Sequence, residues 1–187
     1  MPHDRLDALL DLLALDGLPR SGWVLAGVQG PESIAAHGLG AVLVALAVGP
    51  SVEPPVDVDR VASLCAVHDA PEAWLGDIPR RGAEHLPAGA KHAAEDGVAD
   101  RLLGALSPLA RERFTEFQAG DTREARLARL CDKLHLGLRL LGYVRAGVRG
   151  LDGFRPGLEE LDCSEFPPCD ELRGDILARL DTLSGPP

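Results

Sequence analysis

The chain has 187 residues, of which 45% are hydrophobic and 4% aromatic, and it carries a net charge of −10 with an isoelectric point near 5.0. This length suits one domain whose core is mostly Leu, Ala and Val, a composition that favours helices over sheets. The acidic balance argues against a nucleic-acid polymer or an anionic membrane as the main partner, because both call for a basic face.

Apolar residues recur at helical spacing along most of the chain, and clusters of Gly and Pro separate the periodic segments. The predicted helices cover residues 3–15, 31–48, 57–69, 91–106, 122–148 and 171–183, with short helices near 72–77 and after Pro108. Loops are predicted over 18–28 and 80–91, and irregular structure over the Gly-, Pro- and acid-rich stretch 150–169. The sequence therefore predicts an all-α fold of about six to eight helices, in one domain over 1–187 with its core at about 5–148.

No segment carries the pattern of a targeting or membrane signal. The longest apolar run, Leu39 to Val48, is too short to span a bilayer, and no basic region precedes an apolar one at the N-terminus. The four cysteines do not suggest a disulfide framework, although Cys163 and Cys169 lie close enough in sequence to pair. We expect a cytoplasmic protein.

The segment Ala66–Pro79 is the most informative part of the sequence. It places His68, Asp69, Glu72 and Asp77 in otherwise apolar surroundings. Charged groups are costly in a core unless they are paired or bound to a metal ion. The segment therefore indicates a cation site whose remaining ligands come from elsewhere in the chain.

His37 and Asp132 are the candidates for those ligands. His37 lies on an apolar face of its predicted helix, where the alternative is a core histidine with one hydrogen bond. Asp132 shares its helical side with apolar residues, where the alternative is a buried ion pair with an arginine. With His68 and Asp69 they give two imidazoles and two carboxylates, a set that suits one divalent ion such as Mn²⁺, Co²⁺, Zn²⁺, Fe²⁺, Ni²⁺ or Mg²⁺. Such an ion lowers the pKa of bound water and polarises a phosphoryl oxygen.

Glu72 and Asp77 are candidates for acid–base chemistry beside that ion. Glu72 follows Asp69 by three residues, so one helical turn brings it near the metal, where it can hold or deprotonate water. The alternative is an acid that interacts with backbone amides at a helix start. Asp77 can orient a ligand, protonate a leaving oxygen, or simply cap a turn.

Arg20 and Trp23 lie in a Pro- and Gly-containing segment and are candidates for substrate binding. A guanidinium can hold phosphate through two parallel hydrogen bonds. The indole can pack on a sugar or a base. The alternatives are an exposed arginine and a tryptophan that anchors a loop.

The order His37, His68-Asp69, Asp132 resembles the H…HD…D signature of HD-domain phosphohydrolases. The further matches to the 5′-deoxynucleotidase branch of that family are Pro19–Val24, Pro31–His37, Val67–Pro79, Lys91, Glu95 and Leu130–Leu134, within about residues 5–145. The resemblance implies an all-α HD domain, often dimeric, that hydrolyses nucleoside 5′-monophosphates, usually the deoxy form. It implies these roles: metal binding by His37, His68, Asp69 and Asp132, positioning of water by Glu72, phosphate binding by Arg20, support of the site by Asp77, and packing near the sugar by Trp23.

The chain departs from the family pattern around His37. Ala36 and Gly38 stand where the family commonly has an acid and a polar residue, which implies a looser surrounding of His37 or a wider pocket. His135, one turn after Asp132, is an unusual addition, and we expect a plain helix residue there rather than a partner of the site.

Two other functions remain open on the sequence. A di-iron oxygenase would need extra ligands, for which His85 and His92 are the only candidates between His68 and Asp132. A non-catalytic nucleotide-binding module is the second alternative, although a complete ligand set with Glu72 argues against it. We favour a homodimeric phosphohydrolase acting on a small nucleotide monophosphate.

Overall fold

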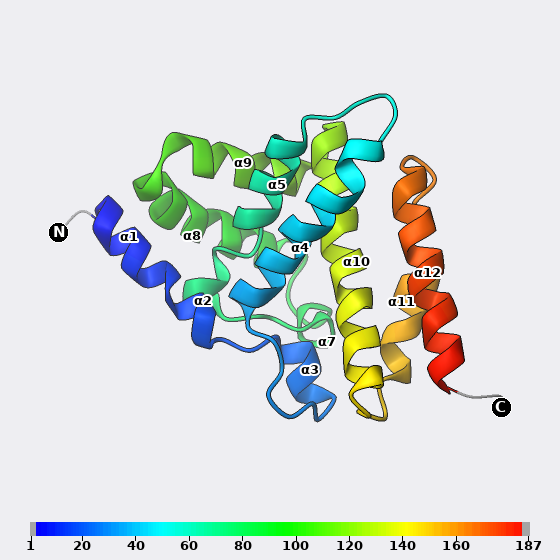
Figure 1. Cartoon of the computed structure of the whole chain (residues 1–187). Coiled ribbons are helices and arrows are strands. Elements are labelled where there is room, and N and C mark those ends of the chain that lie inside the picture. Colours follow the sequence, from blue (N-terminus) through cyan, green and yellow to red (C-terminus); the bar gives the residue numbers. More distant parts are fainter. Residues whose placement is uncertain (1–2, 185–187) are drawn as a thin grey trace.

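The structure is a computed structural model that describes residues 3–184, and these residues form helices and no strand (Figure 1). Seven helices have eight residues or more: α1 (Arg5–Leu12), α4 (Ile34–Val48), α5 (Val58–Val67), α8 (Ala90–Leu106), α9 (Pro108–Ala119), α10 (Arg123–Arg145) and α12 (Pro167–Ser184). The shorter elements are α2 (Ala14–Gly17), α3 (Ser21–Leu25), η1 (Gly49–Ser51), α6 (Glu72–Leu75), α7 (Arg80–Ala83), η2 (Asp152–Phe154) and α11 (Arg155–Glu159). The all-α prediction is confirmed.

The short helices are where the sequence prediction of local structure was wrong. α3 and α7 form one turn each inside the predicted loops, and η2, α11 and the start of α12 lie inside the stretch 150–169 that was predicted to be irregular. α3 begins at Ser21, whose backbone N–H donates to the carboxylate of Asp77, 56 residues away. A cap supplied from so far along the chain leaves no local signal.

The helix that carries His37 also begins later than predicted. Ser33 is its N-cap, and the Ser33 hydroxyl accepts a hydrogen bond from the Ala36 N–H at 3.1 Å. Glu32 therefore lies outside the helix, whereas the sequence pattern predicts it in the first helical turn. This shift leaves the Glu32 carboxylate free to reach into the core.

α4 crosses the middle of the molecule and packs against α5 and α10, while α12 covers another side of α10 (Figure 1). By length and composition Ile34–Ser51 is apolar enough to cross a membrane, contrary to what the run Leu39 to Val48 suggests by itself. Here the helix is a core element, because Ile34, Ala41, Ala45 and their neighbours are buried against the flanking helices. The crossing of α4, α5 and α10 creates the buried space in which the candidate ligands meet.

Candidate active site

Side chains from three helices converge at the centre of the fold. His37 extends from α4, His68 and Asp69 follow α5, and Asp132 lies on α10. His37 Nε2 lies 2.9 Å from Asp132 Oδ1 and 3.9 Å from Asp69 Oδ2. His68 Nε2 lies 3.1 Å from Asp69 Oδ2 and 3.9 Å from Asp132 Oδ1. Ligand atoms that each stand about 2.0–2.2 Å from one ion are about 3–4 Å apart. The ligand atoms of His37, His68 and Asp69 lie within 4.8 Å of one another, and Asp132 Oδ1 lies close to both histidines, so the four side chains surround a place for one ion.

His68 is held in the orientation that a metal ligand needs. Its Nδ1 lies 2.7 Å from the carbonyl oxygen of Cys65 and donates a hydrogen bond to it. Its Nε2 is buried and has no hydrogen-bond partner. A buried polar atom without a partner is costly, and a cation at this position would satisfy it. The donor set therefore fits a divalent ion.

The charges of the site keep both carboxylates ionised. Burial by itself raises the pKa of Asp69, but His68 and Arg20 lower it more, so it falls below its usual range. Burial likewise raises the pKa of Asp132, and Lys133 and His37 outweigh it. Burial lowers the pKa of His68, but Asp69 and Asp132 raise it to about 10. Without a cation, His68 is therefore the positive partner of the two acids.

Glu72 lies on α6 beside this cluster and is buried. Burial and the charges of Asp69 and Asp77 raise the pKa of Glu72 to about 9. Its Oε2 has no hydrogen-bond partner and lies 3.7 Å from Arg20 Nη1. Glu72 is thus a proton-holding group at the edge of the ligand cluster, which is the environment of an acid–base residue.

Arg20 lies among the acids of the site. Its Nη1 donates to Asp69 Oδ2 at 2.9 Å and lies 3.8 Å from Asp77 Oδ1. The other oxygen of Asp77 accepts hydrogen bonds from the Ser21 N–H at 2.7 Å and from the Ser21 hydroxyl at 3.0 Å. Asp77 therefore caps α3 and also faces Arg20, so it holds Arg20 at the mouth of the site.

A cavity of about 660 Å³ opens from these groups. Its polar lining groups include Arg20, Glu72 and Lys91 (the polar end), and its apolar lining side chains include Phe154, Leu158 and Leu161 (the apolar wall). The volume falls in the range of small-molecule sites, about 300–1,000 Å³.

Trp23 also lines this cavity but is only 1% exposed. Its ring stacks on Phe154 at 4.1 Å, and its Nε1 donates to Glu32 at 3.0 Å. The indole therefore anchors α3, as the alternative in the sequence analysis had it, and Phe154, which is more exposed, covers one of its faces. No sequence motif singles out Phe154.

Two residues that sequence analysis did not assign to the site lie directly behind His37. His135 Nδ1 lies 3.0 Å from His37 Nδ1, and Glu32 Oε1 lies 3.9 Å from the same atom. The expectation that His135 is a plain helix residue was wrong. Burial, together with the charges of His37 and Arg139, lowers the pKa of His135 to about 3, so its ring is neutral at neutral pH. Spacing alone could have placed His135 on the side of Asp132, since the two are three residues apart on one helix.

Other candidate ligands stay outside the site. His85 and His92 are both exposed, and neither joins a group of possible metal ligands among residues 3–184. The di-iron alternative therefore gains no ligand from these two histidines. The four cysteines are buried and unpaired, so no bond joins Cys163 to Cys169.

Comparison with known proteins identifies the family. A family model described as an HD domain matches residues 15–150, and the chain belongs to the HD-domain family. The chain is 28% identical over 145 residues to the 5′-deoxynucleotidase hdd1 of Schizosaccharomyces pombe, which covers 73% of this chain and 71% of that protein. It is 30% identical over 143 residues to the 5′-deoxynucleotidase HDDC2 of Bos taurus, covering 72% and 67% of the two chains. The crystal structure of the PH0347 protein from Pyrococcus horikoshii superposes with a TM-score of 0.81 at 29% identity, over 93% of this chain and 99% of that one. The family predicted from the sequence motifs is confirmed.

Proposed function

We propose that this protein is a metal-dependent phosphohydrolase that removes the 5′-phosphate from deoxynucleoside monophosphates. The observation that carries this proposal is the buried group in which the Nε2 atoms of His37 and His68 lie 2.9–3.9 Å from carboxylate oxygens of Asp69 and Asp132. The names of the relatives from Schizosaccharomyces pombe and Bos taurus support a deoxynucleotide substrate.

His37, His68, Asp69 and Asp132 would hold one divalent ion. When bound, such an ion supplies a water of lowered pKa and an electrophile for a phosphoryl oxygen. Two imidazoles with two carboxylates suit the borderline ions Mn²⁺, Fe²⁺, Co²⁺, Ni²⁺ and Zn²⁺ better than Mg²⁺, which prefers oxygen ligands.

Glu72 is proposed to accept the proton of the attacking water. Its unpartnered Oε2 is available for that proton. Two anionic neighbours, Asp69 and Asp77, raise its pKa in the absence of a cation. A positive charge held by Asp69 opposes this effect and moves Glu72 towards the range in which a carboxylate works as a base.

Arg20 and Lys91 are proposed to bind the phosphate. Both line the polar end of the cavity, and Arg20 already faces carboxylates that a phosphate oxygen can replace. Asp77 supports Arg20 from the other side. Because one Asp77 oxygen is committed to Ser21, we propose a positioning role for Asp77 rather than protonation of the leaving oxygen. The nucleoside would lie along Phe154, which covers the buried ring of Trp23.

The test is phosphate release from a panel of deoxynucleoside and ribonucleoside monophosphates with Mn²⁺, Co²⁺, Ni²⁺ or Zn²⁺. We expect turnover of deoxynucleotides and its loss, by about 10³-fold or more, in Asp69→Ala, since a bound ion contributes several kcal/mol to transition-state stabilisation. The matched control is Asp175→Ala, an exposed acid on α12 that does not line the cavity. Tight nucleotide binding without turnover under any metal would overturn the proposal in favour of a binding module.

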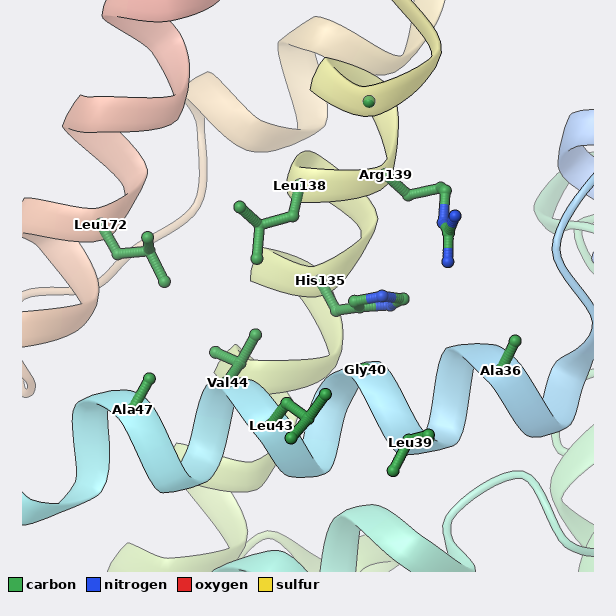
Figure 2. Close-up of a pocket in the computed structure, with 11 residues that line it drawn as sticks. Ala36, Leu39, Gly40, Leu43, Val44, Ala47, His135, Leu138, Arg139 and Leu172 are labelled. Carbon is green, nitrogen blue, oxygen red and sulfur yellow. The ribbon is translucent and has the colours of Figure 1, made fainter.

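We also propose a homodimer. Leu39, Leu43 and Leu46 are 61%, 57% and 47% exposed and form a stripe along α4. The stripe borders an apolar groove of about 560 Å³ between α4, α10 and α12 (Figure 2). Contiguous exposed apolar surface of this kind marks interaction sites. Sedimentation should report a dimer that Leu43→Glu converts to monomer, while Leu109→Glu, at a 55% exposed position on α9, leaves it intact.

The remaining expectations from the sequence also stand as proposals. The net charge of −10 supports a small-molecule substrate rather than a nucleic-acid polymer or a membrane as partner. Four unpaired cysteines are compatible with the reducing cytoplasm. Absence of binding to duplex DNA and to anionic vesicles, together with imaging of a tagged chain in cells, tests these points.

A further inference from the structure

The ring of His37 has two nitrogens that face different surroundings. Nε2 faces the carboxylates of the candidate metal site, 2.9 Å from Asp132 Oδ1. Nδ1 faces away from that site, towards His135 Nδ1 at 3.0 Å. The two rings are tilted by 55° with their centroids 5.0 Å apart, so their contact is edge to edge through these nitrogens.

A histidine that binds metal through Nε2 carries its hydrogen on Nδ1, and that N–H needs an acceptor. Glu32 Oε1, the carboxylate oxygen on this side of His37, lies 3.9 Å from Nδ1, beyond hydrogen-bond distance. Glu32 is also engaged already, by Trp23 Nε1 at 3.0 Å and by Arg139 Nε at 2.9 Å. His135 is therefore the group that can accept the hydrogen bond from His37.

The fold makes room for His135 at one position of α4. A Cβ built on Gly40 would stand 1.9 Å from His135 Nε2 and 2.2 Å from its Cδ2, so even alanine cannot fit while the ring stays in place. Figure 2 shows the imidazole of His135 extending from α10 to lie beside α4 near Gly40. A solvent-facing histidine would not require a glycine on the neighbouring helix.

The other ring nitrogen of His135 faces Glu32. Its Nε2 lies 3.9 Å from Glu32 Oε2, the oxygen that accepts from Arg139. If His135 Nδ1 accepts from His37, its hydrogen is on Nε2 and points towards this negative charge. With these hydrogens, His37 Nδ1 donates to His135, and His135 Nε2 faces Glu32, which lies beyond hydrogen-bond distance.

We propose that His135 is a positioning residue for the metal ligand His37. It accepts the Nδ1 hydrogen of His37 and so keeps the Nε2 lone pair directed at the ion. The inference rests on the metal site of the proposed function, and it adds the His135 imidazole as the outer partner of His37, with Gly40 as the residue that admits it.

The test measures Co²⁺ binding to the metal-free chain by calorimetry and by visible absorption, with phosphate release as a second readout. His135→Phe keeps the ring size but removes the acceptor, so we expect the dissociation constant for Co²⁺ to rise by about tenfold or more. His135→Asn retains an oxygen near the position of Nδ1 and should bind Co²⁺ within about threefold of the unmodified chain.

Gly40→Ala tests the same His37–His135 contact by a change on α4, because the added Cβ displaces the His135 ring without altering its chemistry. It should weaken Co²⁺ binding as His135→Phe does. The matched control is Gly38→Ala on the same helix, where a Cβ meets only an ordinary contact at 4.0 Å. If His135→Phe does not fold, the comparison of His135→Asn with Gly40→Ala still decides the question.

Each outcome has a distinct meaning. Unchanged Co²⁺ affinity in His135→Phe, or equal losses in the Phe and Asn variants, overturns the proposal. Two Co²⁺ ions per chain, one of them lost with His135, would also overturn it and would make Glu32, His37 and His135 a second metal site. Failure of the unmodified chain to bind Co²⁺ would instead contradict the metal site of the proposed function.

Discussion

The polar end and the apolar wall of the active-site cavity, as defined above, are built in different ways. The polar end takes its groups from α3 to α10, all within residues 15–150 that the family model matches. The apolar wall at Phe154, Leu158 and Leu161 comes from residues after 150. Long-range hydrogen bonds fix Arg20 and Asp77, whereas the wall depends on packing such as that of Leu158 against Gly137. We infer that the polar end sets the chemistry and that the wall sets how well a nucleoside fits.

The largest effect on activity is expected from Glu72→Gln, a change at the polar end. The amide cannot accept the proton of the attacking water, so kcat should fall by about 10²–10⁴-fold. Co²⁺ binding should persist, because Glu72 is not among the four proposed ligands. Phosphate release and calorimetry on one preparation check both points. A variant that keeps its full kcat would remove Glu72 from the mechanism.

The polar end should also make metal binding depend on pH. Without a cation the pKa of His68 is raised to about 10, above its ordinary value of 6.5, so at neutral pH the ring carries a proton that must leave when Nε2 binds an ion. The apparent Co²⁺ affinity should therefore rise with pH, by up to about tenfold per unit for one proton. Titrations between about pH 6 and 8, in buffers of different ionisation enthalpy, measure this proton release. A pH-independent affinity without proton release would contradict the account.

At the apolar wall, Phe154→Ala should raise KM for deoxynucleotides and change kcat little. It removes a surface for the nucleoside and uncovers Trp23, which we expect to cost about 1–3 kcal/mol of binding, or about 10–200-fold in KM. Steady-state kinetics separates the two constants. A fall in kcat with an unchanged KM would show that this wall takes part in the chemistry.

The smallest effect on KM is expected from a substitution that displaces α11 and, with it, the apolar wall. A Cβ on Gly137 would stand 2.9 Å from Leu158 Cδ1, so Gly137→Ala should push α11 outward and raise KM a few-fold. Gly142→Ala on the same helix has open space around it and serves as the control. Equal kinetics in the two alanine variants would show that the position of α11 does not influence binding.

The difference between local patterns and contacts across helices explains which features the sequence could predict. The fold class and the group formed by His37, His68, Asp69 and Asp132 were predictable, because acids and imidazoles on apolar helical faces are rare and their order carries the family signature. The outer contacts were not. The sequence pattern places Glu32 in the first turn of a helix, whereas the structure shows that Ser33 caps α4 and leaves Glu32 outside it. The position of His135 depends on Gly40, which lies 95 residues away on another helix. Packing across helices decides such contacts, and local periodicity does not contain it.

The most direct test of the central claim is a crystal structure of the Co²⁺-loaded protein with anomalous scattering recorded at the cobalt edge. The account predicts one anomalous peak per chain, about 2.0–2.3 Å from His37 Nε2, His68 Nε2 and a carboxylate oxygen of both Asp69 and Asp132. An absence of cobalt between these four side chains, or a peak held by Glu32 and His135 instead, would contradict it.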